Sequence, residues 1–190
     1  MQKTIDLKKQ TISLIDEIKS VCADAGLSNS GNEYQIITEI FLYKFINDKF
    51  IYELKKIDKK LVNITDLTTY LDKIKKKDYE ILMMRLNENI ARLKPDQFIS
   101  NIYKRQDEPN FSKIFDNVLI GIAKNNDNIF SQLTSGGKKI QIFESISQHV
   151  KDNPDSFCKA IINKLVNFNF ENFFDEKFDF YASIFEYLIK

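Results

Sequence analysis

Apolar residues recur at steps of three and four along almost the whole chain, and this periodicity constrains the fold more than any other feature. Such steps place side chains on one face of an α-helix. The chain has only 5 glycines and 3 prolines in 190 residues, too few for the many turns of an all-β sandwich or barrel. The sequence therefore predicts an all-α fold, an irregular multi-helix bundle, with a short extended piece at residues 139–142 as a local alternative.

Helix boundaries follow from residues that favour helix ends. Short polar side chains cap helix N-termini, glycine commonly ends helices, and proline is tolerated in the first turn. We expect the first helix, residues 5–25, to end at Gly26. Other helices are expected over residues 64–76, 141–150, 154–166 and 179–190, and after Asn32, Asp78, Pro95 and Asn110, with Asn32, Asp78, Asn110 and Asn153 as N-caps.

The chain divides at its only Gly-Gly pair. We expect a main bundle over about residues 1–130, a flexible loop at Gly136-Gly137, and further helices over residues 141–190. The hydrophobic share of 43% is enough for a core. The N-terminal residues are polar and charged, unlike a signal peptide, and no apolar run approaches the ~18 residues of a membrane span. We therefore expect a soluble, cytoplasmic protein without membrane contact.

Charge gives little sign of a nucleic-acid partner. The chain has 28 Lys and Arg against 27 Asp and Glu, a net charge of +1. Compact nucleic-acid-binding domains are usually basic. Any DNA contact must therefore come from a local patch or be shared with a partner.

No set of residues assembles an active site. Cys22 and Cys158 lack Cys-x-x-Cys spacing and are expected to be buried small hydrophobes, with one long-range disulfide as the alternative. His149 has no obvious metal partners, and neither a P-loop nor a dinucleotide-binding glycine motif occurs. The sequence predicts no catalytic, cofactor-binding or metal-binding residue.

Three segments come close to functional motifs. Asn153-Pro154-Asp155 lacks the second proline and the aromatic of the Asn-Pro-Pro-aromatic box of amino-methylating DNA enzymes, so a helix cap is expected there. Gly136-Gly137-Lys138 is compatible with phosphate binding but is typical of an ordinary loop. The phenylalanines of residues 168–180 are expected in core packing or a domain interface rather than in base stacking.

Clusters of lysine have two interpretations. Solvated helix faces explain most such clusters, whereas contact with phosphates would release counterions and contribute to binding. Our hypothesis for phosphate contact concerns five residues: Lys75, Lys76, Lys77, Lys138 and Lys139.

The last expected helix is apolar over an unusually wide arc. Residues ~100° apart place the apolar side chains of residues 179–190 over roughly 220°, against about 100° in an ordinary surface helix. Such a helix should be buried on two sides, one of them against another domain or a second copy. The expected interface residues are Phe180, Ile184, Phe185 and Leu188.

Two segments resemble the modification subunits of type I restriction–modification systems. Residues 40–50, IFLYKFINDKF, resemble an early helix with the pattern LLFLKYLSDKF. Residues 184–189, IFEYLI, resemble the YEYLL helix that precedes the catalytic domain in those subunits. Residues 31–34, 103–106 and 160–166 resemble one branch of the same family, so the resemblance covers nearly the whole chain in order and spacing.

The resemblance implies the helical N-terminal domain of a DNA adenine-N6 methyltransferase that uses S-adenosylmethionine. Such a domain helps to clamp DNA, contacts specificity and restriction subunits, and adjoins its own catalytic domain. In the family, the cofactor loop and the Asn-Pro-Pro-aromatic box lie beyond the part matched here. We therefore expect no cofactor and no catalysis in this chain itself, and the chain resembles a fragment cut at a domain boundary.

Two other classes of function remain open. One is a free-standing helical protein-interaction module, such as a regulator. The other is a helical enzyme with an unrecognised site, which the lack of clustered nucleophile, base and metal ligands disfavours. A reading frame that continues with a Gly-x-Gly loop and an Asn-Pro-Pro-aromatic box would favour the methyltransferase.

Overall fold

The computed structural model describes residues 2–130, 142–171 and 174, with side chains from residue 9 onward. Over these residues the chain is helical and has no strand, which confirms the predicted all-α fold. The α-helices are α1 (Gln2–Asp24), α2 (Gly31–Ile57), α3 (Leu67–Lys73), α4 (Lys76–Arg85), α5 (Ile99–Lys104), α6 (Phe111–Asn125), α7 (Asp127–Phe130) and α8 (Pro154–Val166). The 3-10 helices are η1 (Lys59–Asn63), η2 (Pro95–Gln97) and η3 (Ser147–His149).

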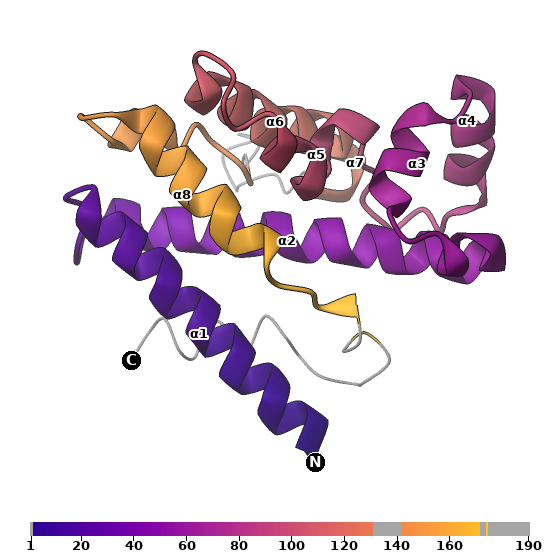
Figure 1. Ribbon diagram of the computed structural model, residues 1–190, viewed down its shortest axis with the longest axis horizontal. Coiled ribbons are helices and arrows are strands. Elements are labelled where there is room, and N and C mark those ends of the chain that lie inside the picture. Colours follow the sequence, from indigo (N-terminus) through magenta and orange to yellow (C-terminus); the bar gives the residue numbers. More distant parts are fainter. Residues whose placement is uncertain (1, 131–141, 172–173, 175–190) are drawn as a thin grey trace, which may run out of the picture.

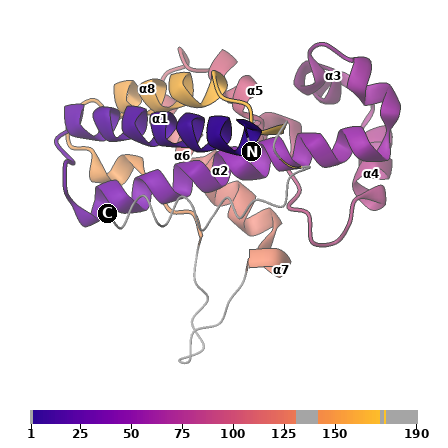
Figure 2. The same ribbon diagram turned by 90° about the horizontal axis from the view of Figure 1, so that it is seen from below.

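Helix α2 forms the axis of the molecule (Figures 1 and 2). It has 27 residues and buries apolar side chains over most of its length, from Ile36 to Leu54. A helix that is buried on several sides needs partners on several sides. Helix α8 packs against α1, α5 and α6, so residues far apart in the sequence share one core with α2.

The last turn of α2, η1, α3 and α4 form a lobe, residues 55–86, at the end of α2 away from the α1–α2 turn (Figure 1). Its small core contains Leu61, Leu71 and Leu82. Leu86 is the C-cap residue of α4, so the helix expected after Asp78 ends there. The chain then turns at residues 86–89, and Leu93 enters the core outside any helix.

Two of the expected N-caps and the start of one further helix differ in the structure. Ser30, not Asn32, caps α2: its hydroxyl accepts the N–H of Glu33 at 3.1 Å. Asp78 lies inside the first turn of α4, after Lys75 at the cap position. Helix α3 begins at Leu67 rather than residue 64 because Asp66 caps it. The predictions were wrong by two to three residues at these boundaries because several polar residues compete for each cap.

The predicted cap Asn110 occupies the N-cap position of α6 but has a left-handed backbone, and its side chain makes no capping bond. The capping acceptor comes from α8 instead. One carboxylate oxygen of Asp155 accepts the Ser112 N–H at 2.9 Å and the Ser112 hydroxyl at 2.6 Å. This contact joins the N-terminal turns of two helices that are 43 residues apart.

The predicted helix at residues 141–150 is wrong over the residues that the structure describes. Residues 142–150 form a loop with one 3-10 turn, η3. Buried carboxylates bind this loop: Asp116 of α6 accepts the Ser147 N–H at 3.2 Å, and Glu39 of α2 accepts the Glu144 N–H at 3.0 Å. Because tertiary contacts satisfy these backbone groups, the segment does not need helical hydrogen bonds.

Two predicted helix ends are confirmed. Gly26 has φ 74° and ends α1, a left-handed conformation that glycine adopts without strain. Asn153 caps α8 by accepting the Ser156 N–H at 3.2 Å, with Pro154 in the first turn. The Gly136-Gly137 loop, all of the extended piece except residue 142, and the helix at residues 179–190 lie outside the described residues; residue 142 is not in a strand.

Candidate functional site

The lobe concentrates the basic charge of the chain. Residues 55–86 contain nine Lys and Arg but five Asp and Glu, whereas the whole chain is nearly neutral. Lys75, Lys76 and Lys77 are exposed at the start of α4. Lys76 pairs with Glu80 at 3.9 Å, and its side chain remains 92% exposed. Within the described part of the chain, Lys75 and Lys77 form no ion pair, so all three ammonium groups face solvent.

The position of these lysines is unfavourable for the helix itself. A helix N-terminus carries partial positive charge, so cations there reduce helix stability. No side chain caps α4, and Lys75 occupies the cap position. Free backbone N–H groups and lysine side chains at one helix end together form a site suited to phosphate. The lysine placement therefore fits anion contact better than it fits helix stability.

The lobe is fixed to the bundle by polar contacts on several elements. The Thr68 and Ser100 hydroxyls lie 2.6 Å apart, and the Lys104 ammonium lies 3.4 Å from the Asp66 carboxylate. The Tyr79 hydroxyl also donates to the carbonyl of Leu93. These bonds hold the basic surface in a defined position on the end of α2.

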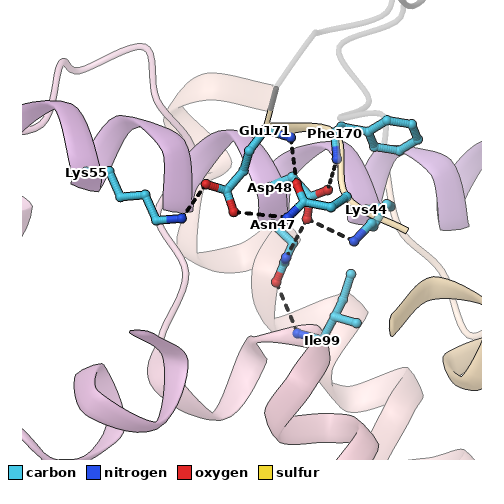
Figure 3. A network of polar contacts seen from close by, with 8 residues as sticks. Lys44, Asn47, Asp48, Lys55, Ile99, Phe170 and Glu171 are labelled. Atoms are coloured by element: carbon cyan, nitrogen blue, oxygen red, sulfur yellow. Dashed lines mark hydrogen bonds and ion pairs between the residues drawn. The ribbon is translucent and has the colours of Figure 1, made fainter. Parts of the chain in front are cut away.

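A buried polar cluster lies at the middle of α2 (Figure 3). The Asp48 carboxylate binds the Lys44 ammonium at 3.0 Å, the Asn47 amide at 2.9 Å and the N–H of Phe170 at 2.8 Å. The Asn47 amide oxygen accepts the N–H of Ile99 at 3.0 Å. Lys44, Asn47 and Asp48 are each no more than 5% exposed. The cluster therefore joins α2 to the start of α5 and to the segment after α8.

Burial dominates the electrostatics of this cluster. It raises the pKa of the Asp48 carboxyl above its ordinary value, and the Lys44 ammonium is the largest effect opposing that rise. The N–H of Phe170 and the Asn47 amide also stabilise the charged form. Asp48 and its partner Lys44 therefore form a structural ion pair. Loss of either partner would leave the other charge buried and uncompensated.

A polar pocket of about 310 Å³ adjoins the cluster. Its walls come from α2, the cap of α3, the start of α5 and the segment after α8. Its ionisable side chains include two lysines, Lys44 and Lys55, and three acids, Asp48, Asp66 and Glu171. Because each of these charges is paired within the described residues, the pocket offers no strong preference for anion or cation.

The residues considered for chemistry have structural positions. Cys22 and Cys158 are free, buried thiols, which confirms the core interpretation over the disulfide. Burial raises the pKa of the Cys22 thiol to about 12. The Nε2 atom of His149 is buried and has no hydrogen-bond partner in the described part of the chain. Among the described residues no group of three or more His, Cys, Asp or Glu side chains can hold a metal ion.

The near-miss motif and the phenylalanine stretch also have packing roles. Asn153 caps α8 with Pro154 in the first turn, as predicted, and Asp155 caps α6. Phe170 is 1% exposed, and its ring centroid lies 6.5 Å from that of Phe41. Phe174 packs edge-on against Phe45 at 5.4 Å. In the described part of the stretch, Phe170 and Phe174 pack on α2, and Phe168 packs against Phe170.

Several expected site residues cannot be placed. Lys138 and Lys139, the Gly136-Gly137-Lys138 segment, and the interface residues Phe180, Ile184, Phe185 and Leu188 lie outside the described residues.

The polar cluster on α2 was not anticipated from the sequence. Its signal was present: Lys44, Asn47 and Asp48 interrupt the apolar run of α2 at steps of three and four, on one helix face. Polar residues on the buried face of a helix usually bind each other or nearby backbone. Their partners Ile99 and Phe170 are 52 and 122 residues away, and periodicity contains no information about such contacts.

No helix within the described residues is long and apolar enough to cross a membrane. Comparison of the chain with protein-family models, with curated proteins and with solved structures finds no match to any of them.

Proposed function

We propose that this chain is the helical N-terminal domain of the modification subunit of a type I restriction–modification system, and that it helps to clamp DNA without catalysing the reaction. The observation that carries the DNA contact is the uncapped N-terminus of α4 with Lys75, Lys76 and Lys77 around it. Contacts of this kind neutralise phosphates and position DNA, but they do not read its sequence.

The resemblance over residues 40–50 supports the family assignment in a physical way. Four residues agree with the family pattern, and three of them, Lys44, Asp48 and Phe50, are each no more than 4% exposed. Lys44 and Asp48 form the buried ion pair of the polar cluster. Family members are expected to keep the residues that form the core, even when their surface residues differ. Agreement at buried positions therefore supports the family assignment.

The other parts of the proposal follow from the family. Specificity and restriction subunits would be protein partners, a catalytic domain would follow in the same subunit, and S-adenosylmethionine would bind in that domain. Lys138 and Lys139 belong to the proposed DNA contact, and Phe180, Ile184, Phe185 and Leu188 to the proposed domain interface. A cytoplasmic location is part of this proposal.

DNA binding tests the role of the lobe. With a fluorescent duplex, the affinity of the chain should fall as salt rises, with a log–log slope proportional to the number of phosphates neutralised. Changing Lys75, Lys76 and Lys77 together to Ala should reduce that slope by roughly 0.9 per lost contact, about 2.7 in all, on any DNA sequence.

The matched control replaces three exposed lysines outside the lobe, Lys113, Lys124 and Lys151, with Ala. The control should keep the native salt slope. Equal slopes for the native chain and the lobe variant would remove the lobe from the DNA interface, and an absence of salt-dependent binding by the native chain would contradict the DNA-clamp function.

A second candidate, a protein-interaction module, is favoured by another feature of α4. Ile81 and Met84 lie one turn apart on this helix and are 45% and 82% exposed. Exposed methionine and aliphatic side chains are frequent at protein-binding surfaces. The reading frame after Lys190 separates the candidates, since a following Gly-x-Gly loop and Asn-Pro-Pro-aromatic box belong only to the methyltransferase.

A further inference from the structure

The polar pocket beside α2 is formed by four parts of the chain. Its walls belong to α2, the cap of α3, the start of α5 and the segment after α8, and the structure describes every residue that lines it. Its volume of about 310 Å³ lies at the lower end of the range for ligand pockets, roughly 300–1,000 Å³. The pocket therefore has room for a small ligand.

Lys44 brings unused hydrogen-bond donors to this pocket. Its ammonium can donate three hydrogen bonds. Within the described residues its one partner is the Asp48 carboxylate, at 3.0 Å. Lys44 is 3% exposed and lines the pocket, so its remaining N–H groups depend on what the pocket holds. Because unfilled donors on a buried charge are costly, an oxygen atom bound in the pocket would stabilise Lys44.

Other lining groups supply both donors and acceptors. The Thr68 hydroxyl donates to Asp66 at 3.0 Å, so its 2.6 Å contact with Ser100 uses the proton of Ser100. The Ser100 oxygen therefore keeps acceptor capacity. The Lys55 ammonium donates to the Glu171 carboxylate at 2.5 Å (Figure 3), which leaves donors on the lysine and acceptor sites on the carboxylate. Donors thus come from α2, and acceptors from α5 and the segment after α8.

The charges around the pocket favour a neutral ligand. Its lysines are already paired with carboxylates, so a bound anion or cation would add an unbalanced charge. A hydroxyl group is neutral and can both donate and accept a hydrogen bond. The walls also include apolar side chains, Ile51, Ile64 and Phe168, that can cover C–H groups. A molecule with several hydroxyl groups on a small carbon skeleton matches both kinds of surface.

We propose that the polar pocket binds a small neutral polyol of monosaccharide size. Its hydroxyl oxygens accept hydrogen bonds from the ammonium groups of Lys44 and Lys55. Its hydroxyl groups donate to the Ser100 oxygen and the Glu171 carboxylate, and its C–H groups lie against the apolar walls. This site does not depend on the proposed function, because it needs neither DNA nor another subunit.

Nuclear magnetic resonance of the isotope-labelled chain tests this site. The probes are D-ribose, D-glucose and myo-inositol, each added to the whole chain. At least one of them should cause saturable shifts at the amides of Ile99, Ser100 and Asn169, which line the pocket. Sodium acetate and methylammonium chloride, as charged probes, should bind more weakly at the same amides.

The variant Lys55→Met removes one donor from the pocket. The affinity for the polyol should fall by about tenfold, as expected for loss of one hydrogen bond to a charged group. The variant should still fold, because the Lys55–Glu171 pair is partly exposed and such pairs contribute little to stability. The matched control is Lys56→Met, since Lys56 is the next residue of the same helix, is 56% exposed and does not line the pocket. It should keep the native affinity.

Three outcomes would overturn the proposal. An absence of saturable shifts with all three polyols would mean that the pocket holds only water. Tighter binding of acetate or methylammonium than of every polyol would identify a site for ions instead. Equal affinities of Lys55→Met and Lys56→Met would show that the polyol binds elsewhere on the chain.

Discussion

At the scale of single residues, burial controls the chemistry of the two cysteines. Cys22 and Cys158 are fully buried, and loss of hydration is the largest cause of their raised pKa values. The thiolate is the reactive form of cysteine. The raised pKa makes the thiolate scarce and burial makes it inaccessible, so both effects lower the reactivity of these thiols. The buried polar residues of α2 and α6 serve a different purpose, since their side chains bind specific partners.

We predict that the native thiols do not react with a thiol-specific disulfide reagent near pH 8. A pKa of about 12 for Cys22 makes its thiolate fraction roughly a thousandfold smaller than at the ordinary value, tenfold per pKa unit. Denaturant should release both thiols, measured by absorbance. One rapid equivalent from the folded chain would contradict the burial of Cys22 or Cys158.

A second prediction concerns the buried carboxyl of Glu39. Burial raises its pKa, although the Glu144 N–H and the Gln35 amide oppose the rise. A carboxyl with a raised folded pKa stabilises the fold below its unfolded pKa, about 4.3, and this contribution is lost as pH rises through the folded value. Glu39→Gln does not ionise, so its free energy of unfolding relative to the native chain should increase between about pH 4 and pH 7.

Urea unfolding at several pH values measures this difference. Glu88→Gln, which changes an exposed carboxyl in a turn, is the control and should show little pH-dependent difference. A constant offset for Glu39→Gln across the range would mean that folding does not shift the Glu39 pKa.

At the scale of elements, local signals were sufficient where a cap and a periodic face agreed. Helix α8 occupies residues 154–166 as predicted, because Asn153 and Pro154 start it and its apolar residues share one face. Local signals failed at residues 142–150, where the apolar spacing of a helix is present but Asp116 and Glu39 bind the backbone. Competition from distant side chains is not encoded in a local window.

We predict that Asp155→Ala destabilises the bundle through α6 rather than through its own helix. Its carboxylate caps Ser112, and loss of a cap costs ~1 kcal/mol of the free energy of unfolding. The Ser112 hydroxyl and N–H also lower the pKa of Asp155. The stabilisation should therefore be present above an unfolded pKa of about 3.9 and be lost as pH falls through the lowered folded value.

Asp152→Ala is the matched control, since Asp152 is an exposed acid three residues earlier. Thermal unfolding should separate the two variants, and hydrogen exchange should show faster exchange at the Ser112 amide only in Asp155→Ala. Equal stability of both variants would contradict capping across helices.

At the scale of the whole molecule, the sequence predicted the fold class and the exposure of the lysines, but not the arrangement. Periodicity identified helices and their apolar faces. Periodicity did not predict that α8 packs on α1, or that the basic residues lie together in a lobe at one end of α2. The pairing of α8 with α1 joins opposite parts of the sequence, and the lobe is placed by side-chain contacts such as Thr68 with Ser100, 32 residues apart.

We predict that the chain does not bind S-adenosylmethionine. Catalysis on a DNA base requires a pocket with stacking and polar groups for the extruded base, and the polar pocket beside α2 has its charges paired internally. Calorimetric titration of the chain with the cofactor should show only heats of dilution. Saturable binding at micromolar concentration would contradict the proposal that the cofactor binds in another domain.

The packing of α8 on α1 has a consequence for synthesis on the ribosome. Helix α1 emerges from the ribosome before α8, yet Ile15, Ile18 and Cys22 lie in a core that α8 helps to close. Helix α8 can pack on α1 only after residues 154–166 have been translated and have left the ribosome. Until then the apolar face of α1 lacks its final partner. Chains are made at about 5–20 residues per second. The interval therefore lasts many seconds, and during it chaperones or transient contacts with α2 must protect α1.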